Sequence, residues 1–238
     1  MENWWQWASE HTAGWPSKEE VPQGVRLNLG CGRVILPNDE GWLNIDSQPL
    51  DGVDQVVNLF EFPWPIAENS ADYIIASHLI EHIPHQVRIR GTWVEEGYDH
   101  HLGTAWMQMY DTGPHPLDGF FAFFAEAWRV LKPNGVITCI APYGATDMAF
   151  QDPTHTRYIV PETFTYLMPS VDSPYDYGLP FRYEFARNLM VFPTMALKDL
   201  AEQVIQHHMT HSWNAGHTIR ADLRALKGID SENRIAVD

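Results

Sequence analysis

Two glycines separated by a single residue end a short apolar run near the start of the chain. The run Val25–Leu29 is too short for a helix and indicates a buried parallel strand, which stops in a tight turn at Gly30 and Gly32. Glycine has no Cβ, so such a turn can adopt positive φ angles and approach a ligand closely. The next apolar run ends on the carboxylate of Asp46. A glycine turn followed by an acid at the tip of the next strand is an arrangement that binds a nucleoside through its ribose hydroxyls.

The glycine spacing indicates which nucleoside cofactor binds. A dinucleotide fingerprint requires a third glycine three residues after the second, and that position holds Ile35. The segment Leu27–Gly32 resembles motif I of the class I S-adenosylmethionine-dependent methyltransferases, and Asp46 resembles their ribose-binding acid. The resemblance implies that S-adenosyl-L-methionine is the cofactor. It also implies that the cofactor is bound by Asn28, Leu29, Gly30, Cys31, Gly32 and Asp46.

Later segments extend the same resemblance in the same order. In the family, the residue at the end of the third strand meets the adenine, which places Asn58 and Leu59 there. A fourth strand over 70–78 then leads to His78 near the methionine end of the cofactor and to the pair Glu81–His82. The segment Arg129–Val136 resembles a further family signature. Together they imply an α/β fold: a Rossmann-like, doubly wound, seven-stranded, mostly parallel sheet with one antiparallel strand.

Apolar patterns predict the elements of this fold. Strands are expected at 25–29, 42–46, 54–59, 70–78, 136–142 and 218–226, with an extended run at 182–192. Helices are expected at 117–131, from 161, and at 195–208. The first crossover, 33–41, is near the minimum length and contains Pro37, so it predicts a single helical turn or none. Family topology places the last, antiparallel strand beside the strand at 136–142.

Composition limits the classes of partner. The 238 residues carry 31 acidic and 15 basic side chains, a formal net charge of −16, which disfavours nucleic acid as a substrate. Two cysteines in apolar runs favour neither a disulfide framework nor a cysteine-rich zinc site, and they fit a reducing compartment. No run approaches the 18 apolar residues of a membrane helix, and the N-terminus lacks signal-peptide features. We therefore expect a cytoplasmic protein that makes no membrane contact.

One methyltransferase domain, 1–238, accounts for the whole pattern. Residues 1–24 hold four tryptophans, which predicts that this segment docks on the domain, either as plain packing or as a lid. Residues 84–118 are rich in glycine, proline, histidine and aromatic side chains, and they interrupt the family pattern as an insertion. Insertions on an α/β scaffold tend to carry substrate specificity, so the acceptor is expected to meet this region. A small-molecule or saccharide acceptor is expected; the sequence predicts no oligomeric state.

Three histidines follow strands whose carboxyl ends form the ligand-binding edge of such a sheet. Methyl transfer requires a nucleophile held near the methyl group and, for a hydroxyl or protonated amine, a proton acceptor, for which histidine is suited. The candidates are His78, His82 and His155, each with a structural role as its alternative. His155 is favoured, with Arg157 anchoring it or an anionic group of the substrate.

The run His78-Leu79-Ile80-Glu81-His82 permits a different chemistry. On a helix, residues i, i+3 and i+4 share a face, so His78, Glu81 and His82 would point together, and His155 could be a fourth ligand. The run matches the inverted zincin pattern and resembles the metal motif of small-RNA 2′-O-methyltransferases and quinone-pathway O-methyltransferases. The upstream strand argues against a protease, and the histidine at the first position departs from the methyltransferase motif. We assign no metal ligand from the sequence and keep a metal-dependent O-methyltransferase as the alternative.

Two further classes share part of the pattern. A dinucleotide-binding oxidoreductase would have the same sheet and Asp46, but the missing third glycine and the segment Arg129–Gly135 weigh against it. A non-catalytic module that only binds the cofactor would keep the glycines and lack the acceptor pocket. A comparison of the affinities for S-adenosylmethionine and for NAD distinguishes a methyltransferase from an oxidoreductase. Formation of S-adenosylhomocysteine distinguishes a methyltransferase from a non-catalytic module.

Overall fold

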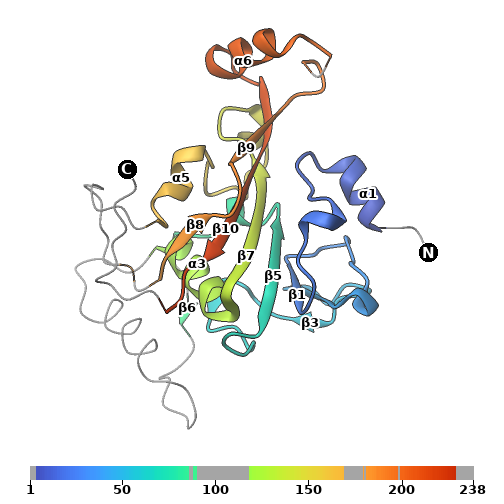
Figure 1. The fold of residues 1–238 in the computed structure, drawn as a ribbon, viewed down its shortest axis with the longest axis vertical. Helices are drawn as coiled ribbons and strands as arrows, with labels where there is room; N and C mark the ends of the chain where they lie inside the picture. Colours follow the sequence, from blue (N-terminus) through green and yellow to red (C-terminus); the bar gives the residue numbers. More distant parts are fainter. Residues whose placement is uncertain are drawn as a thin grey trace.

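A central β-sheet organises the molecule (Figure 1). The computed structural model describes residues 4–85, 88–89, 118–168, 179, 181–197 and 199–228. The strands of the central sheet are β1 (Arg26–Leu29), β2 (Trp42–Asp46), β3 (Gln55–Val56), β5 (Ala71–Ser77), β7 (Leu131–Pro142), β8 (Tyr183–Phe185), β9 (Met190–Pro193) and β10 (Gly216–Ala225). A separate two-stranded sheet pairs β4 (Glu61–Phe62) with β6 (Arg88–Ile89).

The helices within the described residues are short. The α-helices are α1 (Trp4–His11), α3 (Gly119–Val130), α4 (Asp147–Gln151), α5 (Pro161–Thr165) and α6 (Glu202–His211). Single 3-10 turns are η1 (Lys18–Glu20), η2 (Asn38–Glu40) and η3 (Ile80–His82). The predicted short first crossover is confirmed, because η2 is its only helical turn among these described elements.

The strand order is β3-β2-β1-β5-β7-β10-β8, and β9 also pairs with β10. The strands from β3 to β7 run parallel to one another. The last strand, β10, lies beside β7 and runs antiparallel to it and to both of its other partners. The predicted doubly wound, mostly parallel sheet with an antiparallel strand beside the fifth is therefore confirmed: seven strands form the main order as predicted, and β9 is an additional partner of β10.

Three predicted elements differ in extent. The third strand is only Gln55–Val56, because Asp54 instead accepts the Asn44 N–H and the chain turns at Asn58. The helix predicted from 195 begins at Glu202, after two successive turns closed by Leu197 N–H and Leu200 N–H. The strand predicted from 136 begins at Leu131, with an irregular register before Tyr73 meets Val136.

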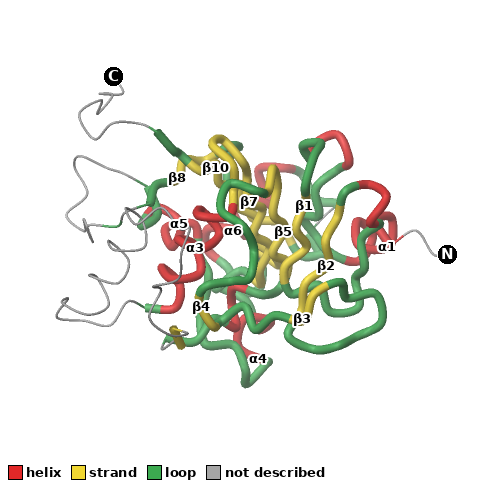
Figure 2. Tube along the Cα trace, turned by 90° about the horizontal axis from the view of Figure 1, so that it is seen from below, coloured by secondary structure: helices red, strands yellow, loops and turns green. Residues whose placement is uncertain are grey.

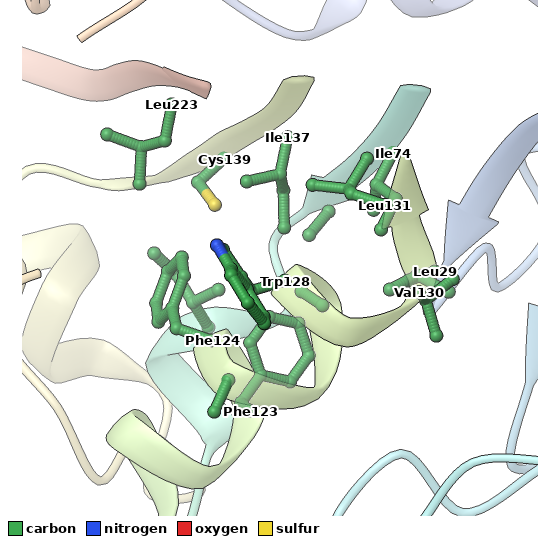
Figure 3. Packing of buried hydrophobic residues seen from close by; sticks show 14 of the residues in the cluster. Leu29, Ile74, Phe123, Phe124, Trp128, Val130, Leu131, Ile137, Cys139 and Leu223 are labelled. Carbon is green, nitrogen blue, oxygen red and sulfur yellow. The ribbon is translucent and has the colours of Figure 1, made fainter. Parts of the chain in front are cut away.

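One face of the sheet is covered by α3, and this contact forms the main core. Asp118 caps the helix by accepting the Phe120 N–H at 2.9 Å, and the following residues are almost all buried. Figure 3 shows Phe124 and Trp128 of this helix against Ile137 and Cys139 of β7 and Leu223 of β10. Burial of large aromatic side chains contributes much of the stability of such a core.

The other face is covered by the N-terminal segment. Val21 and Trp42 pack with Tyr73, Ile75 and Ile140, and Trp15 lies against this cluster. Strand alternation explains the division, since successive residues of β5 point to opposite faces. Figure 2 shows α1 and α3 at opposite sides of the sheet. The predicted docking of residues 1–24 is confirmed for its described part, 4–24; the side chains of Trp4, Trp5 and Trp7 lie outside the described residues.

Much of the predicted insertion lies outside the described residues, which include only 84, 85, 88, 89 and 118 of the range 84–118. Within the described ranges, none of the helices combines the length and the apolar character needed to cross a lipid bilayer.

Candidate functional site

The carboxyl ends of β1, β2, β5 and β7 meet at one edge of the sheet, which is where parallel α/β sheets bind ligands. The turn after β1 has positive φ at Gly30 (64°) and Gly32 (52°). A Cβ at Gly30 would lie 2.9 Å from Leu79, so packing as well as backbone geometry requires glycine there. A Cβ at Gly32 would meet no described atom within 4 Å, so this residue faces open space. The turn is therefore closed on one side and open on the other.

Asp46 joins the end of β2 to the glycine turn. Its carboxylate accepts the Gly32 N–H at 2.8 Å and the Gln48 N–H at 2.9 Å. Oδ1 also accepts the Ser47 hydroxyl at a long 3.5 Å, whereas Oδ2 has a second lone pair that can accept a hydrogen bond from a ligand. The acid predicted from sequence is thus held by backbone groups with its remaining acceptor capacity available.

A pocket lies between these elements. It is lined by Gly30, Asp46, Ser47, Asn58, Leu59, Phe60 and Leu79. Four of these residues are among the predicted cofactor-binding residues: Gly30, Asp46, Asn58 and Leu59. Sequence reasoning missed Ser47, Phe60 and Leu79. Their signal was position, since Ser47 and Phe60 directly follow Asp46 and Leu59, and an aromatic ring there suits a planar base.

Other predicted cofactor residues face the interior. Asn28 is buried and donates through its side-chain amide to the Val34 carbonyl at 2.8 Å and to Asn44 at 3.0 Å. Leu29 belongs to the main core. Burial, and then the Asp46 carboxylate, raise the pKa of the Cys31 thiol to about 12, so this side chain is a neutral thiol. These three residues shape the turn from behind instead of lining the pocket.

His78 ends β5 in a strained conformation. Its φ is 52°, which is uncommon for a residue with a Cβ and is often found at functional sites. Its side chain is 39% exposed, and its Nδ1 lies 3.3 Å from Oε1 of Glu81. Leu79, the next residue, lines the pocket. His78 is therefore a partly exposed imidazole next to a residue that lines the pocket, with the Glu81 carboxylate beside it.

His82 and His155 lie together with Glu81. The two rings have centroids 4.7 Å apart and meet edge to face. One potential ligand atom from each of Glu81, His82 and His155 lies within 4.8 Å of the others. The structure thus brings together three members of the predicted metal alternative, and the fourth, His78, contacts the cluster through Glu81.

Arg157 is directed toward protein groups. Its guanidinium donates to the carbonyls of Ile83 at 2.7 Å and Pro84 at 3.0 Å, and it forms an ion pair with Asp118 at 2.7 Å. Its side chain is mostly buried, and burial lowers its pKa, an effect that the Asp118 carboxylate opposes. The contacts made by Arg157 fix the end of η3 and the start of α3; the ring of His155 is bonded elsewhere, through Nδ1 to the Ala149 carbonyl at 2.9 Å.

Comparison with known proteins identifies the fold. No family model and no curated protein matches the chain. Among solved structures, a SAM-dependent methyltransferase from Archaeoglobus fulgidus has a TM-score of 0.50 at 15% identity, covering 85% of this chain and 86% of its own. A putative S-adenosylmethionine-dependent methyltransferase from Listeria monocytogenes has a TM-score of 0.48 at 11% identity, covering 88% and 96%. A complex of a Haloferax volcanii putative methyltransferase with the Trm112 methyltransferase activator has a TM-score of 0.47 at 14% identity, covering 87% of this chain and 84% of its own.

At such low identities a match shows the fold alone. The match to the Archaeoglobus protein and the strand order agree, so the chain has the fold of the class I methyltransferases. The activity has to be argued from the residues of the site.

Proposed function

We propose that this protein is an S-adenosylmethionine-dependent methyltransferase that acts on a small-molecule or saccharide acceptor. The observation that carries the proposal is the pocket in which the open glycine turn, the Asp46 carboxylate and the segment Asn58–Phe60 meet at the ligand-binding edge of the sheet. These are the groups that a nucleoside cofactor needs: close backbone approach, a ribose acceptor and a surface for the base.

The residues of the pocket fit this cofactor part by part. Asp46 can accept the ribose hydroxyls, and Asn58 with Leu59 and Phe60 can hold the adenine. The bound cofactor supplies an electrophilic methyl group on a sulfonium. The protein then has to hold the acceptor in line with that methyl group and exclude water. The net charge of −16 supports a small-molecule or saccharide acceptor over a nucleic acid.

Removal of the acceptor's proton requires a base at the same edge. His155 was favoured from the sequence, but its side chain is only 8% exposed and its Nδ1 is hydrogen-bonded to the Ala149 carbonyl. His78 is the more accessible imidazole, and its Nδ1 lies 3.3 Å from Oε1 of Glu81. We therefore assign proton acceptance to His78. Arg157, whose guanidinium contacts Ile83, Pro84 and Asp118, has a positioning role.

We also propose that the protein acts in the cytoplasm.

Calorimetry tests the cofactor assignment. The wild-type chain is expected to bind S-adenosylmethionine and S-adenosylhomocysteine, and not NAD. Asp46→Ala removes a charged hydrogen-bond acceptor and should weaken binding by about 1.5–3 kcal/mol.

Asp51→Ala is the matched control, because this exposed carboxylate lies in the same loop and outside the pocket. Unchanged affinity in Asp46→Ala, with a native melting temperature, would refute the assignment. Binding without release of S-adenosylhomocysteine across an acceptor screen of sugars, phenols and peptides would favour a non-catalytic module.

A further inference from the structure

The carboxylate of Glu81 is the starting point, because it is buried without a hydrogen bond. The side chain is 2% exposed, and no group of the described residues donates a hydrogen bond to either oxygen. His78 Nδ1 is 3.3 Å away but outside hydrogen-bond geometry. Burial of an ionised carboxylate is costly unless a positive charge compensates for it. A cation bound beside Glu81 would supply this compensation.

Two imidazoles beside Glu81 are fixed in the tautomer that binds a metal ion. His155 Nδ1 lies 2.9 Å from the Ala149 carbonyl, which can only accept, so Nδ1 carries the proton. His82 Nδ1 lies 3.1 Å from Oγ1 of Thr154, whose own hydroxyl donates to Asp152. The hydrogen-bond network thus assigns the proton to Nδ1 in both rings. Nε2 of His155 lies 3.9 Å from Oδ2 of Asp152, which is beyond hydrogen-bond distance, so its lone pair remains available to a metal ion. Metal-binding histidines typically have this outer hydrogen bond.

The backbone holds the two parts of the cluster in place. The Glu81 carbonyl accepts the N–H groups of Thr156 at 2.9 Å and Arg157 at 3.1 Å. The Ile83 carbonyl accepts the Thr156 hydroxyl and the Arg157 guanidinium, both at 2.7 Å. The turn η3 and the loop 152–157 are therefore hydrogen-bonded together. Because they are already held in place, the protein loses little conformational entropy when a ligand bridges them.

The ligand types indicate the kind of cation. Two imidazole nitrogens and one carboxylate oxygen suit first-row divalent transition metals, whereas magnesium and calcium prefer oxygen. Bonds of about 2.0–2.2 Å place neighbouring ligand atoms about 3–3.5 Å apart. The present separations, within 4.8 Å, need only a small side-chain rotation to close. Three protein ligands would leave coordination positions open, as in catalytic sites.

We propose that Glu81, His82 and His155 bind one divalent transition-metal cation, and that this cation holds the oxygen of the methyl acceptor. Its role in methyl transfer rests on the proposed function, whereas its binding does not. The cation lowers the pKa of the acceptor hydroxyl, whose proton passes to His78. The oxygen then bonds to the methyl carbon while the carbon–sulfur bond breaks, and the electron pair converts the sulfonium to a neutral thioether. The site thereby selects acceptors with a hydroxyl group.

Titration of the full chain with Co²⁺, followed by visible absorption, tests the site directly. Wild type is expected to bind one equivalent with the ligand-field bands of a four- or five-coordinate ion, and Zn²⁺ should displace it. Glu81→Gln and His155→Gln should each weaken binding by more than about 100-fold, since loss of an outer hydrogen-bond partner alone costs about 10–100-fold. Thr154→Val, which removes such a partner of His82, should fall in that lower range.

A matched control comes from the helix α6, where His207 and His211 stack with ring centroids 4.6 Å apart. Exposed imidazole pairs can bind Co²⁺ adventitiously, so the double variant His207→Ala/His211→Ala is measured in parallel. Retention of the one-equivalent bands in this variant supports the proposal. Their loss there, or their persistence in Glu81→Gln, overturns it.

Folding and cofactor binding are measured on the same samples. Because the buried carboxylate lacks a hydrogen-bond donor, metal-free Glu81→Gln should melt at or above the wild-type temperature. If it instead melts lower and wild type binds no Co²⁺, Glu81 has a structural role and the proposal fails. Calorimetry with S-adenosylmethionine separates the two claims. If the protein binds the cofactor but does not bind Co²⁺, only the metal site is overturned. If the protein does not bind the cofactor, the proposed function is overturned.

Discussion

At the scale of single residues, the site combines strain with unsatisfied polar groups. His78 has positive φ although it has a Cβ, and Glu81 is buried without a hydrogen-bond donor from the described residues. Both features cost stability, and a packed structure tolerates them where function requires them. Both residues belong to the same short segment as Leu79, which lines the pocket. The chemistry of the protein is therefore expected to concentrate in the segment 78–82.

The role of His78 gives a kinetic prediction. His78→Gln keeps a polar side chain but cannot accept a proton, so turnover should fall by about 10²–10⁴-fold if proton removal limits the rate. The affinity for S-adenosylmethionine should change little. His85→Gln is the control, because His85 is exposed and contacts Asp118 instead. Unchanged turnover in His78→Gln would assign the proton to another group.

At the scale of elements, one carboxylate connects three strands at the edge opposite the pocket. Asp72 in β5 accepts the Val25 N–H at 2.8 Å, just before β1. It also accepts Lys132 Nζ at 2.7 Å, from the irregular start of β7. Burial by itself would raise the pKa of Asp72, but the bonds from Lys132 and Val25 outweigh it and hold the pKa below its usual value. The connection aligns the strands whose other ends carry the site.

This shift gives a pH-dependent prediction. A carboxyl group with a lowered pKa in the folded state stabilises the protein above its unfolded pKa of about 3.9, and this contribution is lost as pH falls through the folded value. Asp72→Asn should therefore lower the free energy of unfolding by about 1–3 kcal/mol at pH 7. The difference from wild type should shrink below about pH 4. Urea unfolding at both pH values measures it, with the exposed Asp39→Asn as control; equal losses at both values would contradict the argument.

At the scale of the whole molecule, ion pairs join the N-terminal segment to the last strand of the sheet. Arg220 of β10 is buried, pairs with Asp222 at 2.8 Å and reaches Glu20 of η1 at 3.1 Å. Arg187 also pairs with Glu20, at 3.2 Å. The N-terminal segment that covers one face of the sheet is thus fastened to the last strand. In this fold the segment occupies a face that crossover helices would cover in a regular doubly wound sheet.

Loosening this contact should expose the segment without unfolding the sheet. Glu20→Gln removes the charge that both arginines share, so amide protection in residues 12–22 should fall while that of β5 and β7 remains. Hydrogen exchange followed by mass spectrometry measures both regions. Glu19→Gln is the matched control, since this neighbouring side chain is exposed. Equal protection in the two variants would show that apolar packing around Trp15 holds the segment by itself.

The sequence predicted the fold and four of the residues that line the pocket at the ligand-binding edge of the sheet. Apolar runs, glycine spacing and the acid at a strand end are local patterns, and the backbone rules that they follow act over a few residues. This is why Gly30, Asp46, Asn58 and Leu59 were predicted and do line one pocket. Because these rules act over a few residues, the predicted start of the helix at 195 and the predicted limits of the strand at 54–59 were wrong. Hydrogen bonds outside the local pattern set the limits of these two elements.

The surroundings of the histidines are visible only in the three-dimensional structure. The sequence placed His78, Glu81 and His82 on one helical face with His155 as a possible fourth ligand. The structure has a single 3-10 turn there and groups Glu81 and His82 with His155, which lies 73 residues after His82. The burial of Glu81, the exposure of His78 and the outer hydrogen bonds of both rings depend on how η3 packs against the loop after β7. Burial and proton position are properties of surroundings that several distant segments build, so no local pattern contains them.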